Sequence, residues 1–301
     1  MTKPRVLVLG ATGKTGRRVA DLLHTAGVGV RTAARHDADV HFDWGDIATY
    51  DPAVADIDAV FLSMQTLRDG HAQEVSMFLD HAQTSGLQHV TLLSARGVDQ
   101  APAEVPARAV ELDVAARNGL THTVLRPNWF MQNFSEAFFQ PSIASEGVIL
   151  APTGASTEAF IDAEDIAEVA LATLLHPQKH NGAQYMLSGP EALSFAEVAQ
   201  HIARASGLVV RHDDLPVEDW VAQNLAAGME HDFAALHVML FAAINAGAGS
   251  SLSDDVRRVT GHPARRFADY AEAAHVLGKW SRQRPPARPT EAPAGNPVAA
   301  D

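Results

Sequence analysis

The sequence predicts an α/β protein built on a doubly wound parallel sheet, with a smaller, mainly helical lobe toward the C-terminus. Short apolar runs such as Arg5–Gly10 and Asp58–Ser63 alternate with helical patterns of about 10–15 residues, which is the rhythm of βαβ units. These runs are almost continuously apolar and do not alternate with polar residues. Continuous apolar strands are typical of a parallel sheet that helices cover on both faces.

The order of the elements follows from the same patterns. Up to Pro127, strands are expected at residues 5–10, 28–34, 40–42, 58–63, 89–94 and 121–126, with helices between most of them. After Pro127 the alternation loosens, and strands are expected near residues 148–150, 183–188 and 208–211. A helix is expected from about Asp162. Ser194 and Glu197 form a capping box at the start of another helix, which ends at Gly207.

Composition excludes several classes of function. The chain has 301 residues, 47% of them apolar and 20% charged, which is ordinary globular composition. Its formal net charge of −13 argues against binding to the phosphate backbone of a nucleic acid. There is no cysteine, which excludes disulfides, thiolate metal sites and cysteine nucleophiles. Without a secretory signal or a long apolar stretch, we expect a cytoplasmic protein that has no membrane partner.

The sharpest motif is a glycine loop, Gly10-Ala-Thr-Gly-Lys-Thr-Gly16, between the first strand and the first helix. Glycines there allow a tight turn and bring backbone N–H groups close to a pyrophosphate at the positive end of the helix. A nucleoside-triphosphatase loop is excluded, because Val8 stands where that motif requires its first glycine. The strand–turn–helix setting predicts dinucleotide binding by Gly10, Thr12, Gly13, Lys14, Thr15 and Gly16.

The end of the second strand indicates which dinucleotide binds. An NAD enzyme usually has an acidic residue there, which binds the ribose 2′-hydroxyl. Here the position holds Arg35, which can bind a 2′-phosphate through two hydrogen bonds, and Lys14 adds a second positive charge. The sequence therefore predicts NADPH (NADP) as the cofactor. The alternative is that Arg35 is only a solvated residue at the end of a strand.

Other ligand contacts are expected beyond the carboxyl ends of the later strands, where ligands bind in parallel sheets. The residues expected to border the ribose and nicotinamide are Ser63, Met64, Gln65, Ser94 and Ala95. After the sixth strand the chain combines aromatic rings with amides, which suits a flat aromatic substrate. Those residues are Asn128, Trp129, Phe130 and Asn133, and their alternative role is a core plug between two lobes.

The catalytic pair of most short-chain reductases, Tyr-x-x-x-Lys, is absent, since no lysine stands four residues after Tyr50, Tyr185 or Tyr270. Reduction of an ordinary carbonyl with a tyrosine acid is therefore disfavoured. An iminium ion needs no proton from the enzyme, and a quinone can take its proton from water, a histidine or a carboxylate. His71 and Glu111 are weak candidates for such a donor, and the alternative for Glu111 is a solvated helix acid.

No metal is expected. The 15 histidines include no H-E-x-x-H motif and no His–carboxylate cluster that the sequence reveals. Asp162 and Asp165 are expected to cap a helix, because carboxylates in a first turn accept hydrogen bonds from its N–H groups.

Five segments together resemble the NmrA-like family of atypical short-chain reductases: the glycine loop, Phe42–Trp44, Leu125–Phe134, Asp162–Ala167 and Tyr185–Pro190. Within this family the chain is similar to the festuclavine and agroclavine dehydrogenases of ergot-alkaloid synthesis, and more distantly to NADPH:quinone reductases. The resemblance implies an NADP-binding Rossmann domain, a small C-terminal lobe and a nicotinamide cleft between them. It also assigns Asp43 and Trp44 to contacts with adenine, the alternative for Trp44 being a half-buried surface ring.

The resemblance completes the expected organisation. We expect a Rossmann domain over residues 1–150, to which residues 162–190 return, then a substrate-binding lobe over 191–280 and a flexible tail over 283–301. The apolar helix Phe233–Ala243 is expected to pack in the core, with roofing of the cleft or a dimer face as alternatives. Monomer and homodimer both stay open.

The expected function is hydride transfer from NADPH to a small apolar acceptor, with an iminium ion or conjugated C=N favoured over a quinone. The preference for iminium comes from the resemblance, and the missing tyrosine agrees with it. The alternative is a non-catalytic NADP(H)-sensing regulator, because the family also contains regulators that bind NADP without turnover. A third possibility is an isomerase or cyclase with no net redox change.

Overall fold

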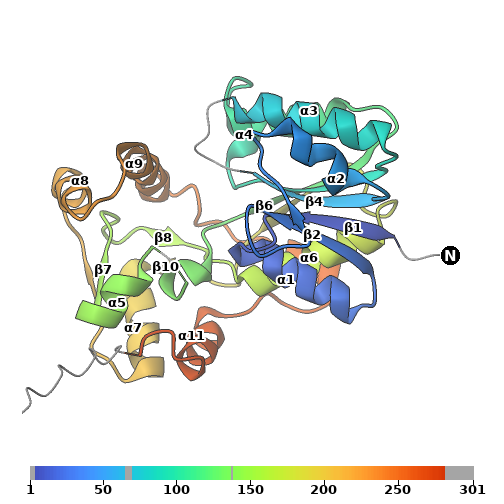
Figure 1. The fold of residues 1–301 in the computed structure, drawn as a ribbon. Helices are drawn as coiled ribbons and strands as arrows, with labels where there is room; N and C mark the ends of the chain where they lie inside the picture. The colour runs from blue at the N-terminus through green and yellow to red at the C-terminus, as the bar shows by residue number, and fades with distance from the viewer. Residues whose placement is uncertain (1–3, 65–69, 137, 282–301) are drawn as a thin grey trace, which may run out of the picture.

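The computed structural model describes residues 4–64, 70–136 and 138–281. Their central feature is a seven-stranded parallel sheet in the order β3-β2-β1-β4-β5-β6-β9 (Figure 1). Its strands are β1 (Arg5–Leu9), β2 (Gly29–Ala34), β3 (Val40–His41), β4 (Ala59–Ser63), β5 (His89–Leu93), β6 (Thr121–Pro127) and β9 (Ala183–Leu187). The order runs outward in both directions from β1, so the predicted doubly wound fold is confirmed.

Helices cover both faces of the sheet, because successive side chains of a strand point to opposite faces. Leu7 and Leu9 of β1 belong to a buried cluster with α2 (Tyr50–Val54), α3 (His71–Thr84) and α4 (Pro106–Ala116). Val6 and Val8 belong to a second cluster with α1 (Lys14–Thr25), α6 (Ala163–Leu175) and α10 (Asp255–Thr260). This arrangement is why the strands read as continuously apolar.

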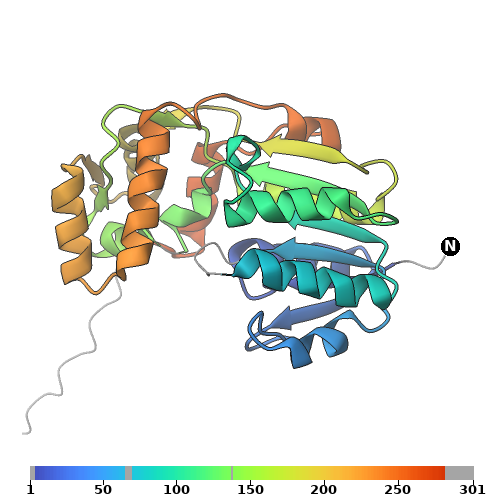
Figure 2. The same cartoon turned by 90° about the horizontal axis from the view of Figure 1, so that it is seen from above.

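A second lobe lies beyond the carboxyl ends of the strands (Figures 1 and 2). It has its own aromatic core, which includes Phe134, Phe195 and Phe241. Two short sheets, β8 with β10 and β7 with β11, join its helices. Its elements are α5 (Gln140–Glu146), β7 (Val148–Leu150), β8 (Thr157–Glu158), β10 (Leu193–Ser194), α7 (Phe195–Ser206), β11 (Arg211–Asp213), α8 (Val217–Ala226), α9 (His231–Asn245) and α11 (Phe267–Val276). The predicted helical C-terminal lobe is therefore confirmed.

Short 3₁₀ turns complete the described chain at η1 (Ile47–Thr49), η2 (Val98–Gln100) and η3 (Met131–Phe134). β9 pairs with β6, and α6 packs beside α1, so these two elements of the later sequence lie with the large sheet. The domain boundaries themselves stay a prediction, and the tail over residues 283–301 lies outside the described residues. Among the described helices, none has the length and hydropathy that crossing a bilayer requires.

Capping residues in the sequence predicted several helix ends correctly. The Ser194–Glu197 capping box is present, Gly207 ends α7, and Asp162 caps α6 by accepting a hydrogen bond from the Glu164 N–H. The strand expected at residues 208–211 is wrong. The strand is Arg211–Asp213, because it must pair in register with the three residues Val148–Leu150 of β7.

A buried histidine lies within the large sheet. His89 of β5 is 1% exposed, and its ring nitrogens lie 3.0 Å and 3.1 Å from the hydroxyl oxygens of Thr121 and Thr91. The pKa of His89 is lowered to about 4. Burial is the main cause, and the nearby His122 and His180 add to the shift. A protonated imidazolium is therefore disfavoured in the folded protein.

We expect His89 to make the fold sensitive to acid. Below pH 6.5 the unfolded chain binds a proton at this residue, whereas the folded protein does not bind it until pH falls to about 4. The free energy of unfolding should therefore fall by about 2 kcal/mol from pH 7 to pH 5 through this group. When urea unfolding is measured at pH 7 and at pH 5, the free energy of unfolding should fall less in His89→Gln than in the unchanged protein. The exposed His36→Gln control should match the unchanged protein, and an equal loss in all three proteins would contradict the prediction.

Candidate cofactor and substrate site

The glycine loop allows backbone to approach backbone. Gly10 has a φ of +65°, which favours glycine, and a Cβ added there would lie 2.5 Å from Ser63 Oγ. A Cβ added at Gly16 would lie only 2.2 Å from the carbonyl oxygen of Gly10. The turn between β1 and α1 can therefore close only without these side chains.

The first turn of α1 suits an anion. Its N-cap, Gly13, offers no side-chain cap, and the first turn contains no acidic residue. The N–H groups there keep both their hydrogen-bonding capacity and the positive end of the helix dipole. The Thr15 hydroxyl is buried and has no hydrogen-bond partner. Among the side chains of the described residues, only the Thr153 hydroxyl is in the same state. A diphosphate would satisfy an orphaned donor of this kind, so the loop fits the predicted dinucleotide.

Basic side chains of α1 connect this loop to the segment after β6. Lys14 Nζ donates a hydrogen bond of 2.7 Å to Asn133 Oδ1, which joins a predicted cofactor residue to a predicted substrate residue. Arg17 and Arg18 form ion pairs with Glu136. Burial lowers the pKa of Lys14, and Glu136 opposes this shift by favouring the ammonium. These contacts place the start of α1 beside the segment after β6.

Arg35 directly follows β2 and is exposed, with no partner for its guanidinium among the described residues. The neighbouring Arg31 is different, because it donates to the carbonyl oxygens of Ala53 and Ala55. Asp39 is the last acidic residue before β3. Its carboxylate accepts hydrogen bonds from Thr32 N and Oγ1. A cationic group is thus available at the end of β2, as binding of a 2′-phosphate requires.

The predicted adenine contacts lie beside an aromatic cluster. Trp44 is 5% exposed and packs edge-on against Phe42 and His71, so the alternative of a half-buried surface ring is wrong. Asp43 Oδ1 accepts a hydrogen bond of 2.9 Å from Gly45 N. His71, the first residue of α3, is buried, and its Nδ1 lies 3.2 Å from Glu74 Oε2. Their contacts with a cofactor and the proton-donor role of His71 stay predictions.

Glu111 is not the solvated acid that its helix pattern suggested. It is 2% exposed, its two oxygens accept hydrogen bonds of 2.8 Å from Arg126, and Ser94 Oγ donates a third of 2.6 Å. Burial acts to raise the pKa of Glu111, but these donors and Arg108 hold it below its usual value. An ionised, fully paired carboxylate is poorly suited to donate a proton. The geometry therefore favours a structural role for Glu111.

The other residues predicted near the ribose and nicotinamide differ in exposure. Ala95 is exposed, Ser63 is half-buried beside Gly10, and Met64 packs against the cluster under α3. Gln65 lies outside the described residues. The contacts of these residues with a cofactor stay predictions.

A buried amide–carboxyl pair lies just beyond β6. Asn128 Nδ2 donates to Glu158 Oε1 at 2.8 Å and to the Gly249 carbonyl oxygen at 2.7 Å, while its Oδ1 accepts from Arg96. Burial raises the pKa of Glu158, although its hydrogen bonds from Trp129 N and Asn128 oppose the shift. Asn128 thus binds protein groups rather than lying free for substrate. Sequence reasoning missed Glu158, because its partners are remote along the chain.

The two aromatic residues after Asn128 diverge. Phe130 forms an isolated bridge with Ile161 and packs against the core beside α1 and α6. Trp129 is half-buried in the second lobe, where its ring lies 5.7 Å from Phe241 and 6.4 Å from His237 between centroids. Phe130 therefore packs with the core of the large sheet, whereas Trp129 packs with the aromatic core of the second lobe, and their contacts with a substrate stay predictions.

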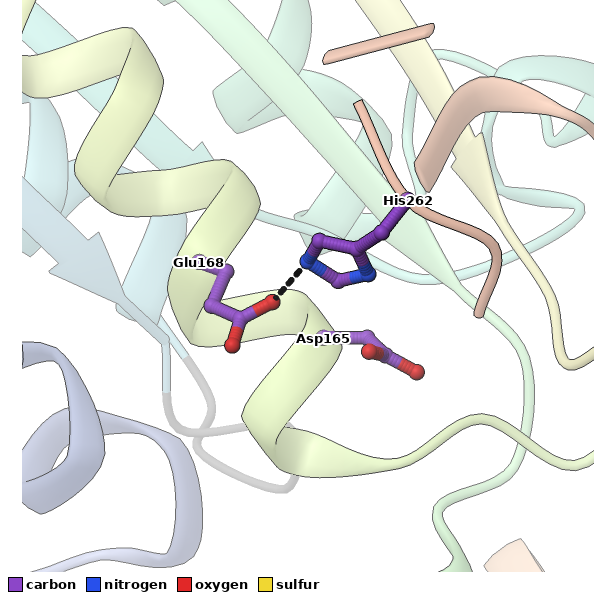
Figure 3. Close-up of side chains that lie close together, drawn as sticks. All are labelled: Asp165, Glu168 and His262. Atoms are coloured by element: carbon purple, nitrogen blue, oxygen red, sulfur yellow. Dashed lines mark ion pairs between the residues drawn. The ribbon is translucent and has the colours of Figure 1, made fainter. Parts of the chain in front are cut away.

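A His–carboxylate cluster is present, contrary to the sequence expectation. Asp165 and Glu168 on α6 lie near His262, and Figure 3 shows the ion pair between Glu168 and His262. Asp165 is not a cap: its carboxylate pairs with Arg265, which also binds Glu168. Burial raises the pKa of Asp165 to about 6. Arg265 binds both carboxylates and offsets part of their charge, and we assign no metal to this cluster.

Comparison with known proteins decides the family. The model of the NmrA-like family matches residues 2–247. The chain belongs to the NmrA-like family. This confirms the resemblance drawn from the five sequence segments.

The relatives cover nearly the whole chain. An uncharacterized oxidoreductase, YesF, of Bacillus subtilis is 35% identical, over 92% of this chain and 96% of its own. Agroclavine dehydrogenase of Claviceps fusiformis is 34% identical, over 88% of this chain and 95% of its own. The structure of the NADPH-dependent quinone oxidoreductase QOR2 of Escherichia coli, complexed with NADPH, has the same fold. It aligns with a TM-score of 0.76 at 20% identity, covering 90% of this chain and 99% of its own.

We expect Gly249 to be indispensable to the Asn128–Glu158 pair. A Cβ at this position would lie 1.6 Å from Glu158 Oε2, so Gly249→Ala must displace a buried carboxyl group. The free energy of unfolding should fall by about 1–3 kcal/mol, which urea titration measures. Gly29→Ala is the matched control, because its Cβ would meet nothing closer than 3.7 Å. Equal stability of the two variants would refute this account.

Proposed function

We propose that this protein transfers hydride from NADPH to a flat, largely apolar acceptor, and that an iminium ion is preferred to a quinone. The single observation that carries the proposal is the glycine loop, with its uncapped helix and the orphaned Thr15 hydroxyl. The wider class, an NAD(P)H-dependent oxidoreductase, is confirmed by relatives such as agroclavine dehydrogenase and an NAD(P)H azoreductase of Xenophilus azovorans.

The preference for NADPH over NADH rests on charge. When bound, the cofactor supplies a hydride, and the residues of this chain hold and orient it. The N–H groups of the first turn of α1 and Thr15 would hold the diphosphate, and Arg35 would bind the 2′-phosphate. Lys14 adds positive charge at the same end of α1. No acidic side chain occupies the position after β2 that would repel this phosphate.

The preference for an iminium acceptor rests on the tyrosines and Glu111, which are engaged with other groups in the part of the chain that the structure describes. All three tyrosine hydroxyls are engaged within the protein: Tyr50 with the Trp44 carbonyl oxygen, Tyr185 with His180 and Tyr270 with Ser135. Glu111 is held ionised by its arginine partners. A cationic C=N bond accepts hydride to give a neutral amine, so no proton from the protein is needed. Reduction of a neutral carbonyl would require one.

A panel of acceptors tests the proposed activity. NADPH consumption is followed by absorbance with a preformed cyclic iminium salt, a quinone and a simple ketone. We expect turnover in the order iminium, quinone, ketone. Tight binding of both NADPH and NADP⁺ with no consumption on any acceptor would favour the regulator instead. Product formation without NADPH consumption would favour an isomerase or cyclase.

Arg35→Ala should selectively weaken NADPH binding. The variant loses the cation that would pair with the 2′-phosphate but keeps every contact to the rest of the dinucleotide. Its Kd for NADPH should rise about tenfold, corresponding to roughly 1 kcal/mol or more for a close charge pair, while its Kd for NADH stays unchanged. Calorimetric titration measures both constants. Equal weakening of both cofactors, or of neither, would overturn the role of Arg35.

A further inference from the structure

A cleft of about 550 Å³ lies between α1 and the second lobe. The described residues that line it are Arg17, Ser135, Glu136, Gln140, Gly278 and Lys279. They come from α1, from the segment that leads into α5 and from the chain just after α11. The cleft opens widely to solvent, and its volume is in the range of small-molecule sites. None of these residues belongs to the glycine loop, so this cleft is a different place from the dinucleotide site.

Lys279 brings an unpaired cation to this cleft. Its backbone is held on both sides, because its N–H donates to the Ala274 carbonyl oxygen and its own carbonyl oxygen accepts a hydrogen bond of 2.7 Å from Gln140 Nε2. The side chain is half-buried, and its ammonium has no hydrogen bond or ion pair with any described residue. Three N–H donors are therefore available from a fixed point of the wall.

Arg17 supplies a second set of donors from the opposite wall. Its side chain is 41% exposed, and Nη2 pairs with Glu136. A guanidinium carries five N–H groups, and those that Glu136 does not use have no partner among the described residues. Arg17 can therefore keep its ion pair and still bind another anion.

The acceptors that line the cleft are largely engaged. Both oxygens of Glu136 accept hydrogen bonds, one from Arg18 at 2.8 Å and the other from Arg17. These arginines hold the pKa of Glu136 below its usual value although burial opposes this, so it is ionised and paired. Ser135 Oγ accepts a hydrogen bond of 2.6 Å from the Tyr270 hydroxyl, which leaves the hydrogen of Ser135 for another acceptor. The lining is therefore rich in donors.

The charge around the cleft is opposite in sign to that of the whole chain. Arg17, Arg18 and Lys279 are balanced by two carboxylates, Glu136 and Glu164, both of which pair with Arg18. The complete chain has a formal net charge of −13. A local excess of positive charge on an acidic protein attracts small anions to that place.

We propose that this cleft is a second ligand site, for a small molecule that carries a phosphate group. The unused N–H groups of Arg17 and the ammonium of Lys279 would bind the phosphate oxygens, and the Ser135 hydroxyl would donate to the same ligand. The remaining volume would hold the body of the molecule. Because Arg17 belongs to α1 and Lys279 follows α11, the ligand would bridge the two lobes. This site takes no part in the proposed hydride transfer.

A phosphate monoester tests the site. Glycerol 3-phosphate is titrated calorimetrically into the full-length protein saturated with NADP⁺, so that the glycine loop does not compete for the phosphate. One molecule should bind per chain, whereas glycerol and acetate should not bind. Lys279→Met should raise the dissociation constant at least tenfold. Lys179→Met, which removes an exposed lysine after α6, is the matched control and should leave the constant unchanged.

Two further variants separate binding from folding. Lys279→Arg keeps the cation and should keep most of the affinity, and Arg17→Gln should weaken binding about tenfold, as Lys279→Met does. Thermal unfolding gives a second readout. Glycerol 3-phosphate should raise the Tm of the unchanged protein and of Lys179→Met but not that of Lys279→Met, because a ligand stabilises only the folded state that binds it.

The inference fails if the unchanged protein does not bind glycerol 3-phosphate, if acetate binds equally well, or if Lys279→Met binds it as tightly as the unchanged protein. Binding that NADP⁺ abolishes would place the phosphate at the glycine loop and would also overturn the inference. Failure of the proposed function is a different result. In that case glycerol 3-phosphate binds as described, but NADPH is not consumed with any acceptor.

Discussion

The close approach of Gly16 to the carbonyl oxygen of Gly10 is the constraint on which the rest of the site depends. A Cβ at Gly16 would lie 2.2 Å from that oxygen, so the start of α1 can rest against the end of β1 only in its absence. This contact places the first turn of α1 at the carboxyl edge of the sheet. From there Lys14, Arg17 and Arg18 reach the segment after β6 and pair with its amide and carboxylate groups.

That basic edge of α1 also positions the second lobe. Glu136 pairs with α1, while two residues earlier Phe134 is fully buried in the aromatic core with Phe139 and Phe267. One short segment therefore belongs to both parts of the molecule, with its polar side chains toward the glycine loop and its rings toward the lobe. Trp129 and His237 derive their orientation from the same aromatic core.

Local pattern was sufficient for the fold and the glycine loop, because both are encoded by neighbouring residues. Alternating strands and helices, the Ser194 capping box and the three loop glycines each act within a few positions. The charged partners could not be predicted in this way. Glu111 is buried only because Arg126 of β6 reaches it, and the contact of Asn128 with Gly249 spans 121 residues. The cleft beside α1 was hidden for the same reason: its lining residues come from α1, the segment that leads into α5 and the chain after α11.

Glu111 and Glu158 show how the groups around a carboxyl group decide whether it can donate a proton. The pKa of Glu111 is lowered although burial opposes this, because arginine guanidinium groups donate to its oxygens. Burial raises the pKa of Glu158, and its hydrogen bonds from the Trp129 N–H and Asn128 and the charge of Arg96 oppose this shift without reversing it, since Arg96 donates to Asn128 and to a backbone carbonyl. Of the two glutamates, only Glu158 has a pKa shifted in the direction that favours the protonated form. Its side chain is 2% exposed, and one carboxyl oxygen lies so close to Gly249 that no Cβ would fit at that position. An acid enclosed in this way is poorly placed to protonate a substrate. The proposed reduction of a cationic C=N bond would need no such acid.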